Sequence, residues 1–176
     1  SVTSALALDT SEQRASDLRT AIGINIEFTP RRRQDADAIF LLSHNGAEAR
    51  SIRPLLAFHY AGDLPVYAIS NIYNGIPDER NQDLNGIQLV ETPWLLGANP
   101  DLLTALATGD AKSGNYTRLK ALGAEAYLVQ SDFLRLQGGA DARMRGNTGL
   151  LTLDPTLSIK RQLSPATFDK GALKAR

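Results

Sequence analysis

The chain has 176 residues, of which 43% are hydrophobic and 22% charged, an ordinary composition for a globular protein. Its 19 basic and 19 acidic side chains cancel, so no long-range field attracts nucleic acid or an anionic membrane surface. The absence of cysteine excludes disulfides, Cys-ligated zinc, iron–sulfur clusters and thiol catalysis. The chain begins without Met and runs directly into a helical pattern. We therefore expect an excised or mature segment, in which a missing targeting signal carries little weight.

The first half of the chain predicts a βαβ unit of an α/β fold. Gly23 is a plausible helix stop, alternating residues follow it, and short apolar runs suit strands buried in a parallel sheet. Pro54 should kink its helix or delay its start. The expected elements are a helix over 4–22, a strand over 24–28, a strand over 36–42, a helix over 46–61, a strand over 65–70, a loop over 74–85 and a strand over 86–90.

The second half predicts two helices and a C-terminal hairpin. Thr92-Pro93-Trp94 breaks the pattern and is the expected crossing between two lobes, which places 1–91 in one α/β lobe and 92–176 in the second. Asn99-Pro100-Asp101 is typical of a helix start. The expected elements are a helix over 99–108, a helix over 116–136 with apolar residues every three or four positions, a turn over 146–149, antiparallel strands over 150–153 and 157–163, and a frayed end.

No catalytic or metal site is predicted. The chain has no nucleophile elbow, no phosphate-binding glycine loop and only two histidines. His59 lies on the apolar face of its helix, which favours a core histidine with one hydrogen-bond partner. Asp35 and Asp37 could form a ligand pair, but a solvated cap before a strand is the favoured interpretation. We expect no cofactor.

Polar side chains follow two of the expected strands. In open parallel sheets, ligands bind beyond the carboxyl ends of the strands. Ser43, His44, Asn45, Ser70 and Asn71 are therefore candidate cleft residues, although an ordinary polar loop is the favoured interpretation of the first three.

Three consecutive arginines, Arg31, Arg32 and Arg33, stand out in a neutral chain. They indicate either a solvated connection, with Asp35 and Asp37 offsetting the charge, or a contact with a partner's carboxylates.

Several strings, in order and with similar spacing, resemble the LpoA (LppC) lipoprotein family from about residue 21 to residue 170. They are Pro30-Arg31-Arg32-Arg33-Gln34-Asp35, Arg53-Pro54-Leu55-Leu56, Leu84-Asn85-Gly86-Ile87, Glu91-Thr92-Pro93-Trp94 and Gly146-Asn147-Thr148-Gly149-Leu150-Leu151.

The resemblance implies a type I periplasmic-binding-protein-like fold, with a mainly parallel sheet, flanking helices and two lobes. It also implies an outer-membrane lipoprotein that faces the periplasm and activates class A penicillin-binding proteins without being an enzyme. The signal peptide, lipidated Cys, helical repeats and first part of the two-lobed domain have no counterpart in this sequence. Sheets that lack strands have open edges, so we expect the segment to self-associate or to need its missing portion.

The leading hypothesis is partner binding through Arg31, Arg32, Arg33, Tyr73 and Trp94, with Trp94 equally suited to a buried hinge. Binding of a cell-wall fragment or amino-acid-like ligand in an inter-lobe cleft is the alternative, and an unrecognised hydrolase is a third. The partner expected from the resemblance is a class A penicillin-binding protein, with no nucleic acid and with membrane attachment only through a lipid anchor.

Overall fold

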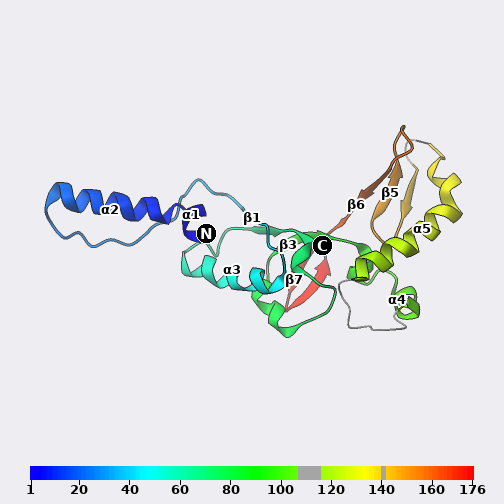
Figure 1. Ribbon diagram of the computed structural model, residues 1–176, viewed down its shortest axis with the longest axis horizontal. Helices are drawn as coiled ribbons and strands as arrows, with labels where there is room; N and C mark the ends of the chain where they lie inside the picture. Colours follow the sequence, from blue (N-terminus) through cyan, green and yellow to red (C-terminus); the bar gives the residue numbers. More distant parts are fainter. Residues whose placement is uncertain (107–115, 140–141) are drawn as a thin grey trace.

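The computed structural model describes residues 1–106, 116–139 and 142–176, which form two β-sheets with flanking helices and an N-terminal arm (Figure 1). The helices are α1 (Val2–Ala5), α2 (Leu8–Ile22), α3 (Gly46–Phe58), α4 (Pro100–Leu106) and α5 (Thr117–Leu136), with the 3-10 turns η1 (Ser70–Ile72), η2 (Glu79–Leu84) and η3 (Pro93–Leu96). The strands are β1 (Ile39–Leu41), β2 (Val66–Ala68), β3 (Gln88–Glu91), β4 (Arg143–Arg145), β5 (Leu150–Leu153), β6 (Ile159–Gln162), β7 (Ser164–Asp169) and β8 (Ala172–Ala175).

The larger sheet contains the predicted βαβ unit. Its strand order is β1-β2-β3-β7-β8, with β1, β2 and β3 parallel and the last two antiparallel. Strand residues alternate between the two faces of a sheet, and the side chains on one face of this sheet pack against α3 and η2. The main core members from the strands are Leu41, Val66, Leu89 and Phe168.

The chain returns to this sheet after visiting the smaller one. The last residues were expected to fray and to belong with the second lobe, but β7 pairs with β3 along its length and β8 pairs with β7. The prediction of a frayed end is therefore wrong, and sheet pairing groups 164–175 with the first part of the chain. Sequence periodicity does not reveal this return, because the pairing joins residues more than seventy positions apart.

The smaller sheet is antiparallel, in the order β4-β5-β6, and packs against α5. The predicted hairpin of β5 and β6 is confirmed, and β4 joins its other side. The predicted long helix is also confirmed as α5, which bends at Asp132. Its apolar stripe is only partly covered, since the side chains of Leu119 and Leu122 remain 60% and 48% exposed.

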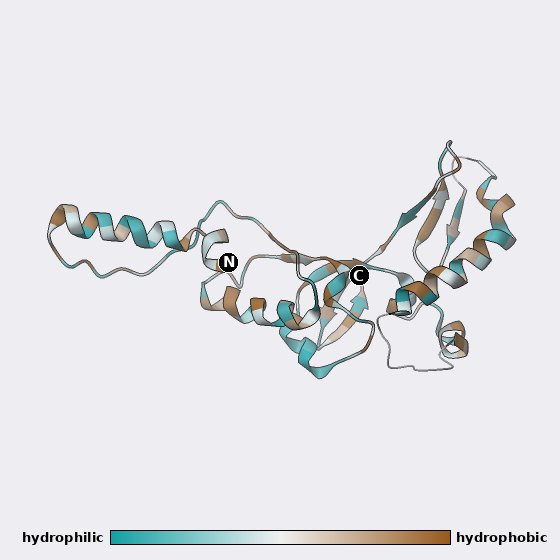
Figure 2. Ribbon diagram, in the orientation of Figure 1, coloured by the Kyte–Doolittle hydropathy of each residue, from teal (hydrophilic) through white to brown (hydrophobic). Residues whose placement is uncertain are grey.

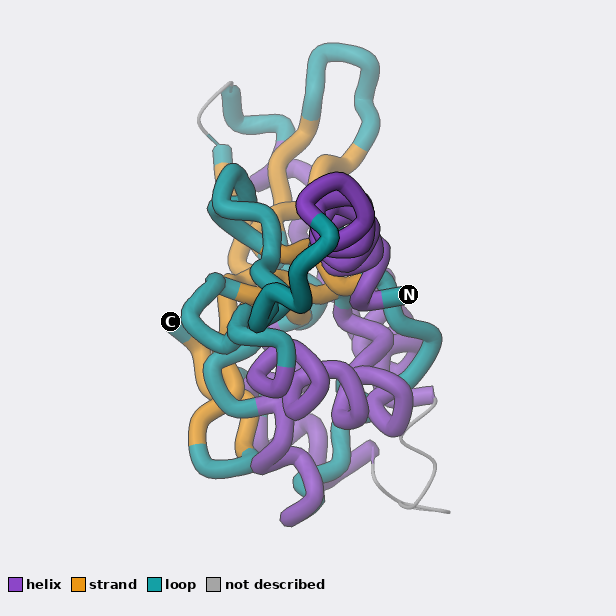
Figure 3. Tube along the Cα trace, turned by 90° about the vertical axis from the view of Figure 1, so that its left-hand side faces the viewer, coloured by secondary structure: helices purple, strands orange, loops and turns teal. Residues whose placement is uncertain are grey.

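An arm formed by α2 and the extended segment after it reaches away from the sheets (Figures 1 and 3). Gly23 ends α2 with a left-handed conformation (φ 70°), as predicted. The strand expected over 24–28 does not form: no strand lies beside it, Ile24 is 65% exposed, and the Ile26 carbonyl accepts from the Arg19 side chain instead. Helix α2 is mostly hydrophilic or neutral (Figure 2), and only Leu8, Ser11 and Ala15 are buried.

Three local expectations also change. Pro54 lies inside α3, which nevertheless starts at Gly46 and continues to Phe58. His59 is the C-cap of α3, half-buried against the Phe58 ring rather than a core residue. The expected loop over 74–85 contains η2, which Asp78 caps by accepting from the Arg80 amide.

Candidate functional site

A polar pocket of about 530 Å³ lies beyond the carboxyl ends of β1 and β2, where ligands bind in open parallel sheets. Helix α3 and turn η1 begin beside it, η2 contributes one wall, and α5 reaches in from the second sheet. Its lining residues are His44, Asn45, Gly46, Ala47, Arg50, Asn71, Ile72, Tyr73, Asn74, Asp78, Arg80, Asn81 and Arg118.

Three of the five cleft residues predicted from sequence, His44, Asn45 and Asn71, line this pocket together. Ser43 is buried beneath it and donates from its hydroxyl to Glu48 at 2.8 Å. Ser70 lies beside it and supplies a backbone carbonyl to Arg118 at 2.8 Å. Strand ends thus predicted the location, whereas the lining contributed by η2 and α5 carried no local sequence signal.

The start of α3 is closed by its own side chains. Asn45 Oδ1 accepts from the Glu48 amide at 2.9 Å, and the Glu48 carboxylate accepts from the His44 amide at 2.9 Å. Together with the bond from Ser43, this reciprocal arrangement satisfies donors at the helix start. The His44 amide, followed by the Ser43 hydroxyl, lowers the pKa of Glu48 because both donate to its ionised form.

Arg118 and Glu91 form an ion pair at the base of the pocket, and sequence analysis missed it. Glu91, at the end of β3, is 1% exposed and accepts from both Nε and Nη2 of Arg118. Arg118, in the first turn of α5, also donates to the carbonyls of Ser70 and Tyr73 at 2.8 and 2.9 Å. This side chain therefore fixes α5 to the carboxyl end of β3, the central strand of the larger sheet. The only sequence signal for this ion pair was an isolated acidic residue, Glu91, at the end of a strand.

The other two guanidinium groups of the pocket differ in their partners. Arg80 pairs with Asp78 at 2.7 Å and, through its side-chain hydrogen bonds, lowers the pKa of that carboxyl to about 2. Arg50, half-buried on α3, donates from Nη1 to Asn81 Oδ1 at 3.2 Å. No carboxylate among the described residues forms a salt bridge with Arg50.

The three consecutive arginines lie on the segment between the arm and β1, away from the pocket. Arg32 bonds to Asp63 and to the Tyr60 carbonyl, both at 2.8 Å, and its side chain is only 12% exposed. Arg33 bonds twice to Asp35, which lowers the pKa of that carboxyl to about 2. Arg31 alone has an exposed side chain without a hydrogen bond or salt bridge in the described part of the chain.

Tyr73 and Trp94, predicted as candidate anchors, are core residues, 6% and 2% exposed. The Tyr73 ring meets Phe168 edge-on with centroids 5.8 Å apart, and burial raises the pKa of its hydroxyl. Trp94 starts the passage between the sheets, where its amide donates to the Asn147 carbonyl at 2.9 Å. Neither ring is available to a partner at the surface, because the return of β7 covers Tyr73 and the η3 turn places Trp94 inward.

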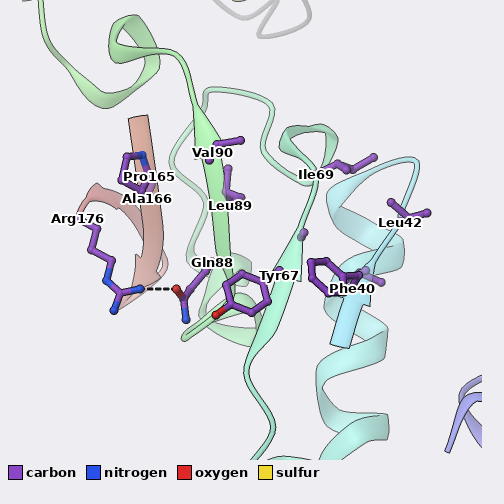
Figure 4. A pocket seen from close by; sticks show the side chains of 12 residues that line it. Phe40, Leu42, Tyr67, Ile69, Gln88, Leu89, Val90, Pro165, Ala166 and Arg176 are labelled. Carbon is purple, nitrogen blue, oxygen red and sulfur yellow. Dashed lines mark hydrogen bonds between the residues drawn. The ribbon is translucent and has the colours of Figure 1, made fainter. Parts of the chain in front are cut away.

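One face of the larger sheet is apolar and uncovered. Phe40 and Tyr67 stack there with centroids 5.5 Å apart, and Phe40 and Leu42 are each 77% exposed. Figure 4 shows these side chains beside Ile69, Val90 and Pro165 around a groove of about 260 Å³. Parallel sheets normally have both faces covered, whereas the described residues leave Phe40 and Leu42 on this face exposed.

The described residues contain no group of three potential metal ligands, and Asp35 pairs with Arg33. None of the helices in the described part is both long enough and apolar enough to span a bilayer.

A family model described as "LppC putative lipoprotein" matches residues 1–171. Among curated proteins, the chain is 27% identical over 165 residues to the penicillin-binding protein activator LpoA of Vibrio vulnificus, covering 93% of this chain and 27% of that protein. It is 28% identical over 141 residues to LpoA of Klebsiella pneumoniae, covering 78% and 20%. The chain therefore spans about a quarter of the length of these relatives.

Among solved structures, the chain matches the LpoA (YraM) C-domain from Haemophilus influenzae, a regulator of PBP1A, with a TM-score of 0.67 and 21% identity. That match covers 92% of this chain and 49% of the C-domain. A "putative branched-chain amino acid ABC transporter" from Chromobacterium violaceum matches with a TM-score of 0.56 and 25% identity over 88% of this chain and 52% of that one. These likenesses confirm the α/β, periplasmic-binding-protein-like fold expected from the sequence.

Proposed function

Because this chain belongs to the LppC lipoprotein family, we propose that it is part of a non-catalytic activator of class A penicillin-binding proteins. The observation that carries the proposal is the family match over residues 1–171, supported by fold similarity to a domain described as a regulator of PBP1A. The relatives are named activators, which supports a role in binding a synthase rather than in catalysis. The protein would act in the periplasm, attached to the outer membrane by a lipid anchor outside this segment.

The partner-binding surface includes Arg31 in this proposal. Arg32 and Arg33 are committed to Asp63 and Asp35, whereas the Arg31 guanidinium is exposed and able to meet a carboxylate of the synthase. The test is stimulation of a purified class A synthase by the full-length protein with Arg31→Glu. We expect stimulation to fall about tenfold, equivalent to one lost charge-assisted contact. Arg161→Glu, on exposed strand β6, is the control, and equal stimulation by both variants would remove Arg31 from the interface.

The proposal also divides the described elements between two lobes. One lobe contains β1–β3 with α3, and the second contains α5 with β4–β6; β7 and β8 complete the first sheet. The uncovered apolar face then belongs against the remainder of the two-lobed domain, since the chain matches only 49% of the solved C-domain.

The isolated segment would self-associate through that same face. Light scattering coupled to size-exclusion chromatography should show a dimer or larger species, and Phe40→Glu should shift it toward monomer because a charge replaces an exposed stacked ring. A stable, folded wild-type monomer would contradict this part of the proposal.

Small-ligand binding is a second candidate function, favoured by the polar pocket of about 530 Å³ at the strand ends. Its volume falls within the roughly 300–1,000 Å³ typical of small-molecule sites. A cell-wall fragment or an amino-acid-like compound is the proposed ligand. Titration of the folded chain with such compounds tests the candidate, and no saturable response to any of them would leave the pocket without a ligand role.

A further inference from the structure

We infer that the polar pocket takes a small ligand with a free carboxylate beside amide groups, and that Arg50 binds the carboxylate. The inference rests on the second candidate function above and defines the chemistry of its ligand. It starts from the charges that line the pocket.

Among the described residues, the pocket contains one guanidinium group that forms no salt bridge. Glu91 pairs with Arg118 and Asp78 pairs with Arg80, whereas Arg50 bonds to the neutral amide oxygen of Asn81 and is the last of the groups that lower the pKa of Asp78. Arg50 is half-buried, and partial burial strengthens its attraction for an anion. A single cation without a salt bridge fits a monoanion such as a carboxylate better than a phosphate dianion.

The start of α3 does not supply a competing anion site. The Glu48 carboxylate already accepts from the His44 amide and the Ser43 hydroxyl, and Asn45 Oδ1 already accepts from the Glu48 amide. A ligand anion that approached these groups would meet the negative charge of Glu48. Arg50 lies one helical turn further along α3, and its Nη1 reaches back to within 3.4 Å of a Cβ added at Gly46, so its guanidinium is the group left to receive the anion.

Four asparagines, Asn45, Asn71, Asn74 and Asn81, supply the rest of the recognition chemistry. The amide oxygens of Asn45, Asn74 and Asn81 already accept from the Glu48 amide, the Ile76 amide and Arg50. Their N–H groups can still donate to the C=O of a peptide bond, and Asn71 offers both a donor and an acceptor. The ligand class that matches this lining is a short peptide or N-acylated amino acid with a free carboxyl end.

The test is an NMR titration of the full-length protein, selectively ¹⁵N-labelled at asparagine, with a mixture of N-acetylated dipeptides, in parallel with the same mixture amidated at its carboxyl end. We expect saturable shifts of the pocket asparagine amides with a Kd near the millimolar range, as one charge-assisted contact plus weaker bonds would give. Amidation of the peptides, or Arg50→Gln, should weaken binding about tenfold or more. Arg161→Gln is the matched control and should bind as the wild type does, while the unchanged remainder of each spectrum verifies folding.

Equal binding of free and amidated peptides would overturn the carboxylate assignment while the pocket kept its ligand role. Tighter binding of inorganic phosphate than of the peptides, or wild-type affinity in Arg50→Gln, would also overturn it. No saturable shift at up to about 10 mM, roughly ten times the expected Kd, would reject both the assignment and the second candidate function.

Discussion

Two buried glutamates, Glu91 and Glu125, hold the two sheets to α5 by different chemistry. Glu91, 1% exposed, is matched by the positive charge of Arg118. Glu125, 4% exposed and part of α5, is held by neutral donors: the amides of Asn147 and Thr148 and the Thr148 hydroxyl. The Glu91 carboxylate is thus held by an opposite charge. The Glu125 carboxylate is held by hydrogen bonds from a loop that lies between Gly146 and Gly149.

This difference predicts different sensitivities. An ion-paired buried carboxylate is vulnerable to loss of its partner, because an uncompensated charge is costly to bury. A carboxylate held by a loop is vulnerable to changes in that loop's backbone. A Cβ added at Gly146 would lie 2.2 Å from Glu125 Oε2, so any side chain at this position would displace either the carboxylate or the loop.

The largest effect is expected for Arg118→Met. The variant leaves Glu91 buried without its cation and frees the carbonyls of Ser70 and Tyr73, so the free energy of unfolding should fall by about 3 kcal/mol. Urea denaturation measures the loss. Adding Glu91→Gln should recover part of it, because the buried charge is then gone. Arg135→Met, at an exposed position of the same helix, should cost less than about 1 kcal/mol; equal losses in the two single variants would show that the ion pair contributes little.

Gly146→Ala should come next. Its methyl group would overlap the Glu125 carboxylate and force the loop outward, at a cost of about 2 kcal/mol. Gly123→Ala is a demanding control on α5: nothing lies within 4 Å of its added Cβ, so it should stabilise the chain by about 0.5–1 kcal/mol through helix propensity. The thermal unfolding midpoint should therefore fall in Gly146→Ala and rise in Gly123→Ala. Shifts of both midpoints in the same direction would contradict the steric argument.

Thr148→Val should have a moderate effect. It keeps the shape of the side chain but removes the hydroxyl that donates to Glu125 Oε1, at a cost of about 1–2 kcal/mol. Thr152→Val on β5, which is only half-buried, is expected within about 0.5 kcal/mol of the wild type. If the two variants unfolded at the same urea concentration, the hydroxyl would have no special role.

The smallest effect concerns a half-buried carboxylate, that of Asp154 in the turn between β5 and β6. The Thr156 hydroxyl, then the Ser158 amide, lower its pKa to about 2. Because the folded-state pKa is depressed, the stabilisation is complete above the ordinary value of 3.8 and is lost as pH falls through about 2. An NMR pH titration of the Asp154 carboxyl should give that midpoint, with the Thr156 amide shifting in step. A midpoint near the ordinary value would show that the turn bonds do not form in solution.

Local signals were enough to predict much of this fold. Asn45 and Asn99 cap their helices, Gly23 ends α2, and the apolar repeat over 116–136 gives α5. The strand over 24–28 failed because a strand needs a neighbour, and alternation alone does not supply one.

The site was predicted less completely than the fold. Strand ends located His44, Asn45 and Asn71, since that rule depends only on topology. Arg50 and Arg118 were missed because their roles depend on which charges the fold pairs and which it leaves without a salt bridge. Tyr73 was assigned to the surface because its covering residue, Phe168, lies far along the chain.

Arg118 and Glu125 are seven residues apart on α5, so they lie on one side of the helix about two turns, or roughly 10 Å, from each other. Each is tied to a different sheet, and the bend at Asp132 comes only after both. The stretch of α5 from Arg118 to Glu125 therefore connects the two sheets. A rotation of the smaller sheet must either move this stretch of helix with it or break the contact at Arg118 or at Glu125.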